Sequence, residues 1–467
     1  MTSRDLHFMG LLDIARQITS GETTSLKVTR AMLDRIEKVD RNFESYIHVC
    51  KDRALQQAQA ADDEIAKGLH KGPLHGVPIA VKDLCYTTYA PTRAGTMIHK
   101  NFAAPYNATV VDRLETAGAV ILGKLTMTEG AYTSHHPDIP LPPNPWSADH
   151  WVGSSSTGSG VATSAGLCFA SLGSDTGGSI RYPSATCGLT GIKPTWGRVS
   201  RHGVFALADS LDHIGPMARS AGDCAAVLQV IAGWDHSDPT SIDAAVPDYL
   251  AELGKGARDM RIGVDRAYAM DGIDPQVSDA LENAIAVFET LGARIIDVTM
   301  PPYTALADAW IRMCAIETAV AHADTYPAQA DAYGPDLIQL IEEGRSATGM
   351  DAAHGHHLRI AFTQALATMF GTVDCMLCPT MPTPTPSLSA MATYGEDPSV
   401  LSEIMRFTAP FDFSGSPTIT LPNGIDSAGL PLSMQIVGPH LGEAVIIRAA
   451  DAYQNATAWH TLEPPMT

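Results

Sequence analysis

The sequence is short of positive charge. Its 467 residues include 31 Lys and Arg against 51 Asp and Glu, which gives a formal net charge of −20. A protein that binds a phosphate backbone needs a basic face, so this balance argues against a nucleic-acid partner. The negative excess favours solubility. With 45% hydrophobic and 18% charged residues, the composition is that of a globular protein with a sizeable core.

Cysteine is also scarce. The eight cysteines are scattered at positions 50, 85, 168, 187, 224, 314, 375 and 378, which is too sparse for a disulfide framework and predicts reduced thiols in the cytoplasm. Cys375 and Cys378 form a lone CxxC, whereas a zinc site would need a second pair of ligands. We therefore expect no metal site, and we expect His354, His356 and His357 on a solvated helix face.

Signals for membranes and targeting are missing as well. No apolar run approaches the length of a membrane span, and residues 1–13 lack the apolar core and the cleavage site of a signal peptide. No internal repeat and no charged linker divides the chain. These observations predict a cytoplasmic protein without membrane association.

The apolar pattern alternates between strands and helices. Helices are predicted at 11–18, 25–39, 54–67, 109–117, 220–231, 275–291, 303–323, 351–370 and 442–454. Strands are predicted at 77–82, 119–122, 168–174, 260–264, 294–298, 375–378, 417–421 and 431–437. The two strand–helix–strand units, at 77–122 and 260–298, predict parallel strand pairs.

Small residues dominate the stretch 153–195, which carries almost no charge. Its predicted strand at 168–174 is followed by Asp175-Thr176-Gly177-Gly178-Ser179, a tight turn that presents the Ser179 hydroxyl beside unshielded backbone N–H groups. A nucleophile next to such donors suits acyl transfer, because the donors stabilise the charge that develops on the carbonyl oxygen. A Gly/Ser loop without catalytic function is the alternative interpretation.

A serine nucleophile needs a base, and no histidine lies in this stretch. Lys82 is the upstream candidate, at the end of the apolar run Val77–Val81. A charged lysine at the end of a buried strand is costly unless it is paired or deprotonated. Lys82 is therefore either a base or a structural lysine that is salt-bridged, with Asp83 as its candidate partner.

Seven segments, in order over nearly the whole chain, together resemble the amidase signature family of serine hydrolases. They are GVPIAVKD (76–83), TEGAY (128–132), NPW (144–146), the stretch 153–195, GRVSRHGVFALADSLDHIGPMARS (197–220), FTAPFDFSGSPTITLPNG (407–424) and GLPLSMQIVG (429–438). The SDTGGSIRYP core, with a serine pair whose Ser155 stands 24 residues before Ser179, makes the resemblance specific.

The resemblance implies a role for each matching residue. Ser179 matches the nucleophile, Ser155 the bridging serine on a cis peptide bond, and Lys82 the catalytic base. The backbone amides of Thr176, Gly177, Gly178 and Ser179 match the oxyanion hole. Asp175, Arg181 and Ser156 match or adjoin the residues that brace these loops.

The serine segment departs from the family pattern, which usually has Gly-Gly before and after the paired serines. Here Ser154 replaces the second glycine of the first pair, and Ser156 is followed by Thr157-Gly158. The cis bond is therefore expected between Ser154 and Ser155. Because three serines are consecutive, a bridge displaced by one residue is the alternative.

Two residues are expected in the substrate pocket. Tyr132 lies in TEGAY, and His136 stands where the family often has an asparagine, with Pro140 in place of a glycine. These two replacements predict an unusual wall of the substrate pocket, which favours a non-standard substrate. Aryl or alkyl amides are the first choice and carbamates are the second. A third candidate is the glutamine-hydrolysing subunit of a tRNA-dependent amidotransferase. A nucleotide-binding loop at GSSSTGSG is disfavoured, since that segment lacks the P-loop lysine.

The resemblance also implies the fold. We expect one α/β catalytic domain over residues 1–467, with a large mixed, mostly parallel twisted sheet wrapped by helices on both faces. The helices of residues 1–70 are expected to pack on it. No metal or organic cofactor is called for, the expected partner is a small amide or carbamate, and a homodimer is left open.

Overall fold

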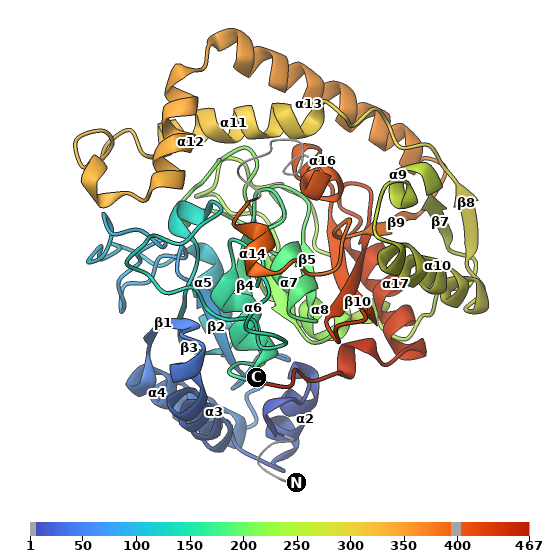
Figure 1. Ribbon diagram of the computed structural model, residues 1–467. Helices are drawn as coiled ribbons and strands as arrows, with labels where there is room; N and C mark the ends of the chain where they lie inside the picture. The colour runs from blue at the N-terminus through green and yellow to red at the C-terminus, as the bar shows by residue number, and fades with distance from the viewer. Residues whose placement is uncertain (1–5, 394–402, 467) are drawn as a thin grey trace.

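An eleven-stranded sheet forms the centre of the computed structural model, which describes residues 6–393 and 403–466 (Figure 1). The strand order is β1-β3-β2-β4-β6-β5-β10-β11-β9-β7-β8. The strands are β1 (Tyr46–Val49), β2 (Pro78–Lys82), β3 (Val120–Leu125), β4 (Ala170–Asp175), β5 (Thr190–Lys193), β6 (His213–Ala218), β7 (Arg261–Val264), β8 (Arg294–Asp297), β9 (Cys375–Pro379), β10 (Thr418–Ile425) and β11 (Pro431–Val437).

The sheet is mixed, as expected, but the expectation of a mostly parallel sheet is wrong. Parallel pairing is confined to β3–β2–β4 and to β9–β7–β8, and every other neighbouring pair is antiparallel. Both predicted strand–helix–strand units are parallel. The pair β10–β11 is antiparallel because a short turn at 426–430 joins the two strands, and a two-strand hairpin can only be antiparallel.

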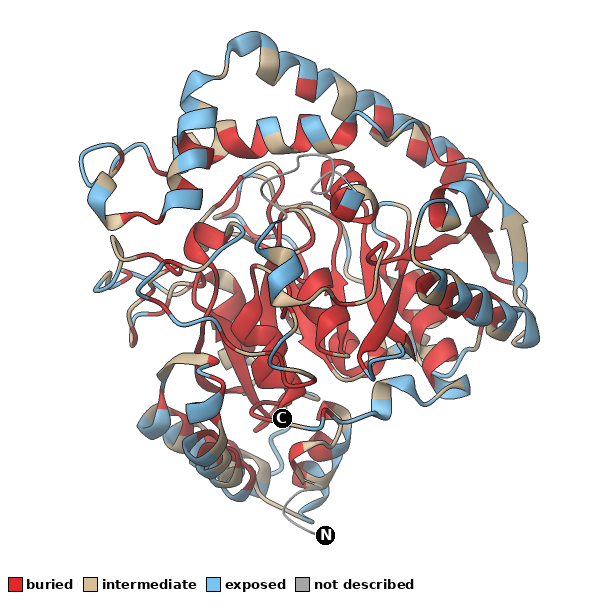
Figure 2. Ribbon diagram, in the orientation of Figure 1, coloured by how far each residue is buried: buried red, intermediate tan, exposed pale blue. Residues whose placement is uncertain are grey.

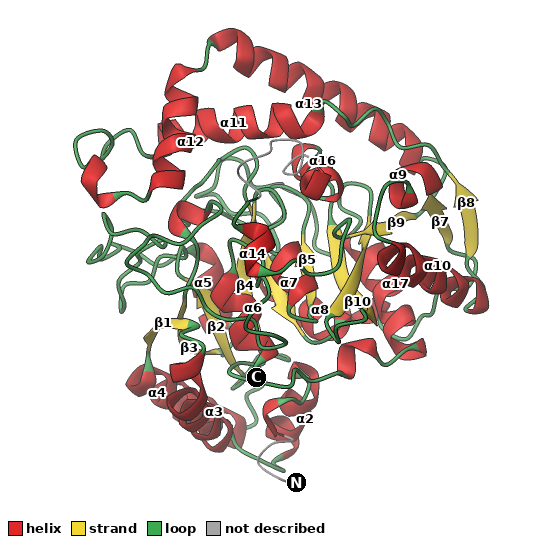
Figure 3. Cartoon of the chain, in the orientation of Figure 1, coloured by secondary structure: helices red, strands yellow, loops and turns green. Residues whose placement is uncertain are grey.

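Helices cover the sheet on both sides (Figure 3). They are α2 (Leu11–Ser20), α3 (Ser25–Val39), α4 (Lys51–Ala66), α5 (Thr109–Thr116), α6 (Thr157–Ser164), α7 (Arg181–Thr186), α8 (Ala221–Ile231), α9 (Arg266–Met270), α10 (Pro275–Thr290), α11 (Leu306–Ala321), α12 (Pro335–Ser346), α13 (Gly349–Phe370), α14 (Leu388–Met391), α16 (Ala409–Phe413) and α17 (Glu443–Ala456). Helices α11, α12 and α13 form an arch above one end of the sheet, which we call the helical cap (Figure 1).

Local signals explain where several helices begin. The Thr24 side chain accepts the Lys27 N–H and so begins α3. Asp274 caps α10, and Pro275 occupies its first turn, where a missing N–H costs nothing. Thr348 and Asp351 form a reciprocal capping box at the start of α13. Each of these helices lies where the apolar spacing predicts one.

The deepest part of the core surrounds β2, β4, α6 and α7, all of which are buried (Figure 2). Small residues make this packing feasible. A Cβ added at Gly158 in α6 would lie 2.5 Å from the Ser45 carbonyl oxygen, so the helix meets the neighbouring backbone directly. The eight cysteines are free and buried, and His354, His356 and His357 are exposed on α13, as expected. Among the described helices, none has the length and apolarity needed to cross a membrane.

A buried ion pair joins β3 to the residue that follows β2. Lys124 Nζ lies 2.9 Å from Asp83 Oδ1, and both side chains are almost fully buried. The Arg93 N–H donates to the other oxygen of Asp83 at 3.0 Å. Asp83 is therefore the partner of Lys124 and not of Lys82, which removes the proposed salt bridge between neighbours in the sequence.

Lys124→Met should destabilise the fold strongly. Loss of the cation leaves the Asp83 carboxylate buried without its partner, at a cost of about 3–5 kcal/mol near neutral pH. Burial already raises the pKa of Asp83, although Lys124 opposes this, so the variant should protonate Asp83 at a still higher pH. Because the folded-state pKa then exceeds the unfolded one, the destabilisation should shrink as the pH falls from about 8 to about 5.

Guanidinium unfolding at both pH values measures this effect. Lys255→Met is the matched control, because Lys255 pairs with Glu252 at 2.8 Å but is 48% exposed. An exposed pair contributes only about 0–1 kcal/mol, so the control should stay close to the wild type. An equal loss in the two variants would contradict the interpretation.

Candidate active site

Lys82 ends β2, and its Nζ lies among three serine hydroxyls. The distances are 2.6 Å to Ser155 Oγ, 2.7 Å to Ser174 Oγ and 2.9 Å to Ser156 Oγ. The side chain is fully buried, and no carboxylate in the described part of the chain lies within ion-pair distance of Nζ. Burial lowers the pKa of Lys82 to about 7, against the opposing influence of Asp175 and Asp212.

The direction of one of these hydrogen bonds is fixed by its surroundings. Ser156 Oγ donates its only proton to the Ser174 carbonyl oxygen at 3.2 Å, so it accepts from Lys82. A neutral amine has two N–H groups and one lone pair. Donation to Ser156 and Ser174 would leave the lone pair of Lys82 facing the Ser155 hydroxyl, which is the arrangement that a base requires.

The serine segment connects this lysine to α6. A cis peptide bond joins Ser154 to Ser155, which confirms the position expected from the sequence. The Thr128 N–H donates to the Ser155 carbonyl oxygen at 3.2 Å, so the TEGAY segment holds the backbone of Ser155 in place. Ser155 is fully buried, and its Oγ is the closest of the three hydroxyl oxygens to Lys82 Nζ.

The turn between β4 and α7 carries Ser179, which is half-buried. The Asp175 carboxylate braces this turn by accepting the N–H groups of Gly178, Ile180 and Arg181 at 2.7, 3.0 and 3.2 Å. The Arg181 guanidinium donates to both oxygens of Asp175 at 2.9 and 3.0 Å. Burial alone would raise the pKa of Asp175, but Arg181 holds it well below its ordinary value.

Three of the four amides expected in the oxyanion hole have no acceptor in the described part of the protein, namely Thr176, Gly177 and Ser179. The fourth differs from the expectation, because the Gly178 N–H is donated to Asp175 Oδ1. Gly178 instead serves the shape of the turn. Its φ is +130°, and a Cβ there would lie 2.3 Å from the Tyr182 ring.

The two predicted pocket residues contact neighbouring segments of the chain, and their place in a substrate pocket stays a prediction. His136 is buried, and its Nδ1 accepts the Asp138 N–H at 3.1 Å. Tyr132 packs against the cluster of Tyr326, Tyr333, Leu337 and Ile341. The neighbouring His135 is the residue that reaches the serine segment, with Nε2 3.1 Å from Thr157 Oγ1. Burial lowers the pKa of His135 to about 4, so its imidazole is neutral near pH 7.

Sequence reasoning missed three side chains that contact the site. Ser174 binds Lys82, and the indole N–H of Trp310 donates to the Thr176 carbonyl oxygen at 2.7 Å. His213 Nδ1 lies 3.1 Å from the Asp175 carbonyl oxygen. Ser174 could have been noticed, since it immediately precedes Asp175 in the predicted strand. Trp310 and His213 lie far along the chain, and no local pattern marks them.

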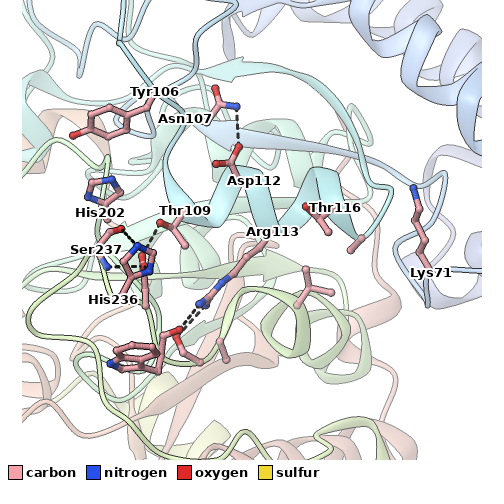
Figure 4. A pocket seen from close by; sticks show the side chains of 16 residues that line it. Lys71, Tyr106, Asn107, Thr109, Asp112, Arg113, Thr116, His202, His236 and Ser237 are labelled. Atoms are coloured by element: carbon pink, nitrogen blue, oxygen red, sulfur yellow. Dashed lines mark hydrogen bonds and ion pairs between the residues drawn. The ribbon is translucent and has the colours of Figure 1, made fainter.

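Other cavities and clusters are separate from these residues. A surface cavity of about 950 Å³ is lined by α5 and the loop after α8, and none of the candidate catalytic residues lines it (Figure 4). Its Arg113 already donates to the carbonyl oxygens of Ile231, Gly233 and Trp234. No group of three or more His, Cys, Asp or Glu suited to a metal ion occurs in residues 6–393 and 403–466.

Comparison with known proteins identifies the family of this chain. The Amidase family model matches residues 27–447. A Mycobacterium bovis protein named as an amidase, AmiD, is 47% identical over 98% of this chain and 96% of its own. A glutamyl-tRNA(Gln) amidotransferase subunit of a Geobacter species is 38% identical over 97% of this chain and 98% of its own. The crystal structure of a bacterial aryl acylamidase of the amidase signature family has a TM-score of 0.87 at 25% identity, over 97% of both chains.

The matched region contains every candidate residue, from Lys82 to Arg181, and the relatives cover nearly the full length of the chain. The chain therefore belongs to the amidase signature family of amide hydrolases.

Proposed function

We propose that this protein hydrolyses amides through an acyl-enzyme on Ser179, with Ser155 as the proton bridge and Lys82 as the base. The observation that carries the proposal is the setting of Lys82 Nζ, which contacts three hydroxyls, has no carboxylate partner among the described residues and is fully buried. Such a lysine holds a lone pair at neutral pH more readily than an ion-paired one.

The reaction that we infer has two stages, acylation of Ser179 and hydrolysis of the acyl-enzyme. Ser179 Oγ attacks the amide carbonyl carbon and gives its proton to Ser155 Oγ, while Ser155 gives its own to Lys82 Nζ. The N–H groups of Thr176, Gly177 and Ser179, which have no acceptor among the described residues, stabilise the oxyanion. The proton then returns through Ser155 to the leaving nitrogen as the C–N bond breaks. Water hydrolyses the acyl-enzyme by the same relay and regenerates Ser179.

For the substrate we propose aryl or alkyl amides, with carbamates as the second choice. The likeness to a solved aryl acylamidase supports an amide with an aromatic amine part. Glutamine hydrolysis within a complex is a second candidate function, favoured by the 38% identity to an amidotransferase component. The net charge of −20 weighs against direct contact with tRNA by this chain.

A substrate screen separates these candidates. We expect p-nitroanilides and primary amides to be hydrolysed faster than p-nitrophenyl carbamates that carry the same alkyl or aryl substituent, as followed by the release of amine, ammonia or p-nitrophenol. Glutamine should be a poor substrate of the isolated chain. A chain active on glutamine alone, or active only after co-purification with other subunits, would favour the amidotransferase function.

Ser179→Ala should abolish hydrolysis, because the acyl-enzyme has no other nucleophile. Loss of a triad member leaves only a small residual catalysis, so a decrease of at least about 10³-fold in kcat is expected. Intact-mass spectrometry after treatment with a fluorophosphonate should find one adduct, on Ser179. An adduct on Ser155 or Ser156 would overturn the assignment of the nucleophile, and Ser156→Ala tests the displaced bridge.

The pH profile tests Lys82 as the base. Only the neutral amine accepts a proton, so kcat/KM for a non-ionising amide should rise as the pH passes about 7, the pKa that burial gives this lysine, and then level off. Lys82→Ala should lower the rate and flatten this rise. Lys82→Arg should not restore it, because arginine stays charged.

A second buried lysine provides the control for this assignment. Burial also lowers the pKa of Lys193 to about 7, and Lys193 does not contact the three serines. Lys193→Met should therefore keep the rise in kcat/KM at the same pH, whatever its maximal rate. Loss of the rise in Lys193→Met, or substantial activity in Lys82→Arg, would contradict the role of Lys82.

A further inference from the structure

In the turn that carries Ser179, side-chain and backbone donors form hydrogen bonds to the carbonyl oxygens of the peptide groups. Each N–H belongs to the same planar group as the carbonyl of the preceding residue. The N–H of Gly177 therefore shares a peptide group with the Thr176 carbonyl, which accepts the indole N–H of Trp310 at 2.7 Å. Trp310 lies on α11 of the helical cap and is buried.

The N–H of Thr176 is held in the same way. Its peptide group includes the Asp175 carbonyl, which lies 3.1 Å from His213 Nδ1. The register of the antiparallel pair β4–β6 explains this contact, because it sets Asp175 opposite His213. A carbonyl oxygen can only accept, so Nδ1 carries the proton of this imidazole.

The other nitrogen of His213 is then an acceptor. Lys193 Nζ lies 3.2 Å from His213 Nε2 and also donates to the Ser416 carbonyl oxygen at 2.6 Å. Burial and the nearby Lys193 lower the pKa of His213 well below its ordinary value, which keeps the ring neutral. Lys193 thus fixes the tautomer that donates to the Asp175 carbonyl.

The N–H of Ser179 completes the pattern. Its peptide group includes the Gly178 carbonyl, which accepts the Tyr182 N–H at 2.7 Å. All three turn amides without an acceptor therefore have a donor on the carbonyl of the same peptide group. The remaining N–H, that of Gly178, is donated to Asp175 and is not available to a substrate.

We propose that Trp310 and His213 are positioning residues of the oxyanion hole, each holding one peptide group by its carbonyl so that the N–H of that group is aimed and polarised toward the developing oxyanion. This inference rests on the proposed function of Ser179. A hydrogen bond to a carbonyl strengthens the N–H of the same peptide as a donor, by roughly 10–30% per bond. The effect is felt most in the transition state, where the oxygen carries charge.

Trp310 also fixes the plane of its peptide group by contact. A Cβ added at Gly177 would lie 2.5 Å from the Trp310 ring, so the indole lies directly on the turn. Trp310→Phe removes the N–H while it leaves an aromatic ring on Gly177. Removal of one direct oxyanion donor costs about 10²–10³ in kcat, so loss of a donor that acts through a peptide group should cost less, about tenfold.

Binding of two probes tests the proposal without the need for a known substrate. Ser179 can add to the carbonyl carbon of phenethyl trifluoromethyl ketone, and this addition places an oxyanion in the oxyanion hole. Hydrocinnamic acid has no electrophilic carbon for Ser179. In Trp310→Phe, the dissociation constant of the ketone should rise about tenfold, and that of the acid should change less than about twofold. With an amide from the screen, kcat should fall by a similar factor with KM nearly unchanged.

Trp146→Phe is the matched control. Trp146 is also buried, and its indole N–H donates to the Cys187 carbonyl oxygen at 3.0 Å, outside the turn. This variant loses an equivalent hydrogen bond and should show a similar loss of stability in guanidinium, but it should bind the two probes in the wild-type ratio. The same selective loss in Trp146→Phe would overturn the proposal.

His213 gives an independent test with a built-in rescue. His213→Leu removes the donor to the Asp175 carbonyl, whereas the amide nitrogen of His213→Asn occupies nearly the position of Nδ1. The ketone should bind about tenfold more weakly to the leucine variant and nearly normally to the asparagine variant. Equal weakening in both variants, or equal weakening of ketone and acid in Trp310→Phe, would show a structural role only.

Failure of the proposed function has a different signature. A Ser179→Ala variant that keeps wild-type hydrolysis and wild-type affinity for the ketone would overturn the function and this inference together. A wild type that forms the Ser179 adduct, combined with variants at Trp310 and His213 that bind both probes normally, would overturn this inference alone.

Discussion

The site depends on keeping carboxylates away from Lys82. Asp83 adjoins this lysine in the sequence and Asp175 ends the neighbouring strand, and each is bound by a different cation. Asp83 pairs with Lys124, and Asp175 pairs with Arg181. An ion pair with either carboxylate would raise the pKa of Lys82 and keep its amine protonated, so that no lone pair would be available. By pairing with these carboxylates, Lys124 and Arg181 allow Lys82 to be a neutral amine.

The same arrangement explains why the core around the site is built from small residues. Three hydroxyls must reach one nitrogen, so β2, β4 and the serine segment must approach closely. Gly173 in β4 illustrates the limit, because a Cβ there would lie 3.0 Å from Ser156 Oγ. Serine and glycine supply the polar groups and the space at once. In the described part of the chain, no side-chain polar atom of Lys82, Ser155, Ser156 or Ser174 is buried without a hydrogen-bond partner.

Amphipathic elements and local motifs could be predicted from the sequence. Helix α3 has the predicted bounds of 25–39, because its apolar spacing and the Thr24 cap are local features. Strands β5 and β6 and helices α6 and α7 were missed, since they are buried on all sides and show no alternation of polar and apolar residues. Helix α12 was also missed, although Leu337, Leu340 and Ile341 have helical spacing after Pro335.

Local motifs likewise predict some residues of the site and not others. Lys82, the serine pair and the turn belong to contiguous motifs, so their contacts could be anticipated. His213 reaches the turn only through the register of β4 and β6, and Trp310 only through the docking of the helical cap. The use of the Gly178 N–H by Asp175 is a matter of backbone geometry within one turn, which residue types alone do not determine.

Charge balance behind the turn supports the same chemistry. Arg181 contacts both Asp175 and Asp412, and all three are fully buried. Burial raises the pKa of Asp412 well above its ordinary value, although Arg181 opposes this. His213 is neutral, and the pKa of Lys193 near 7 leaves it partly so. The raised pKa of Asp412 lowers its tendency to add a negative charge beside the turn, where such a charge would oppose an oxyanion and would hold the proton on Lys82.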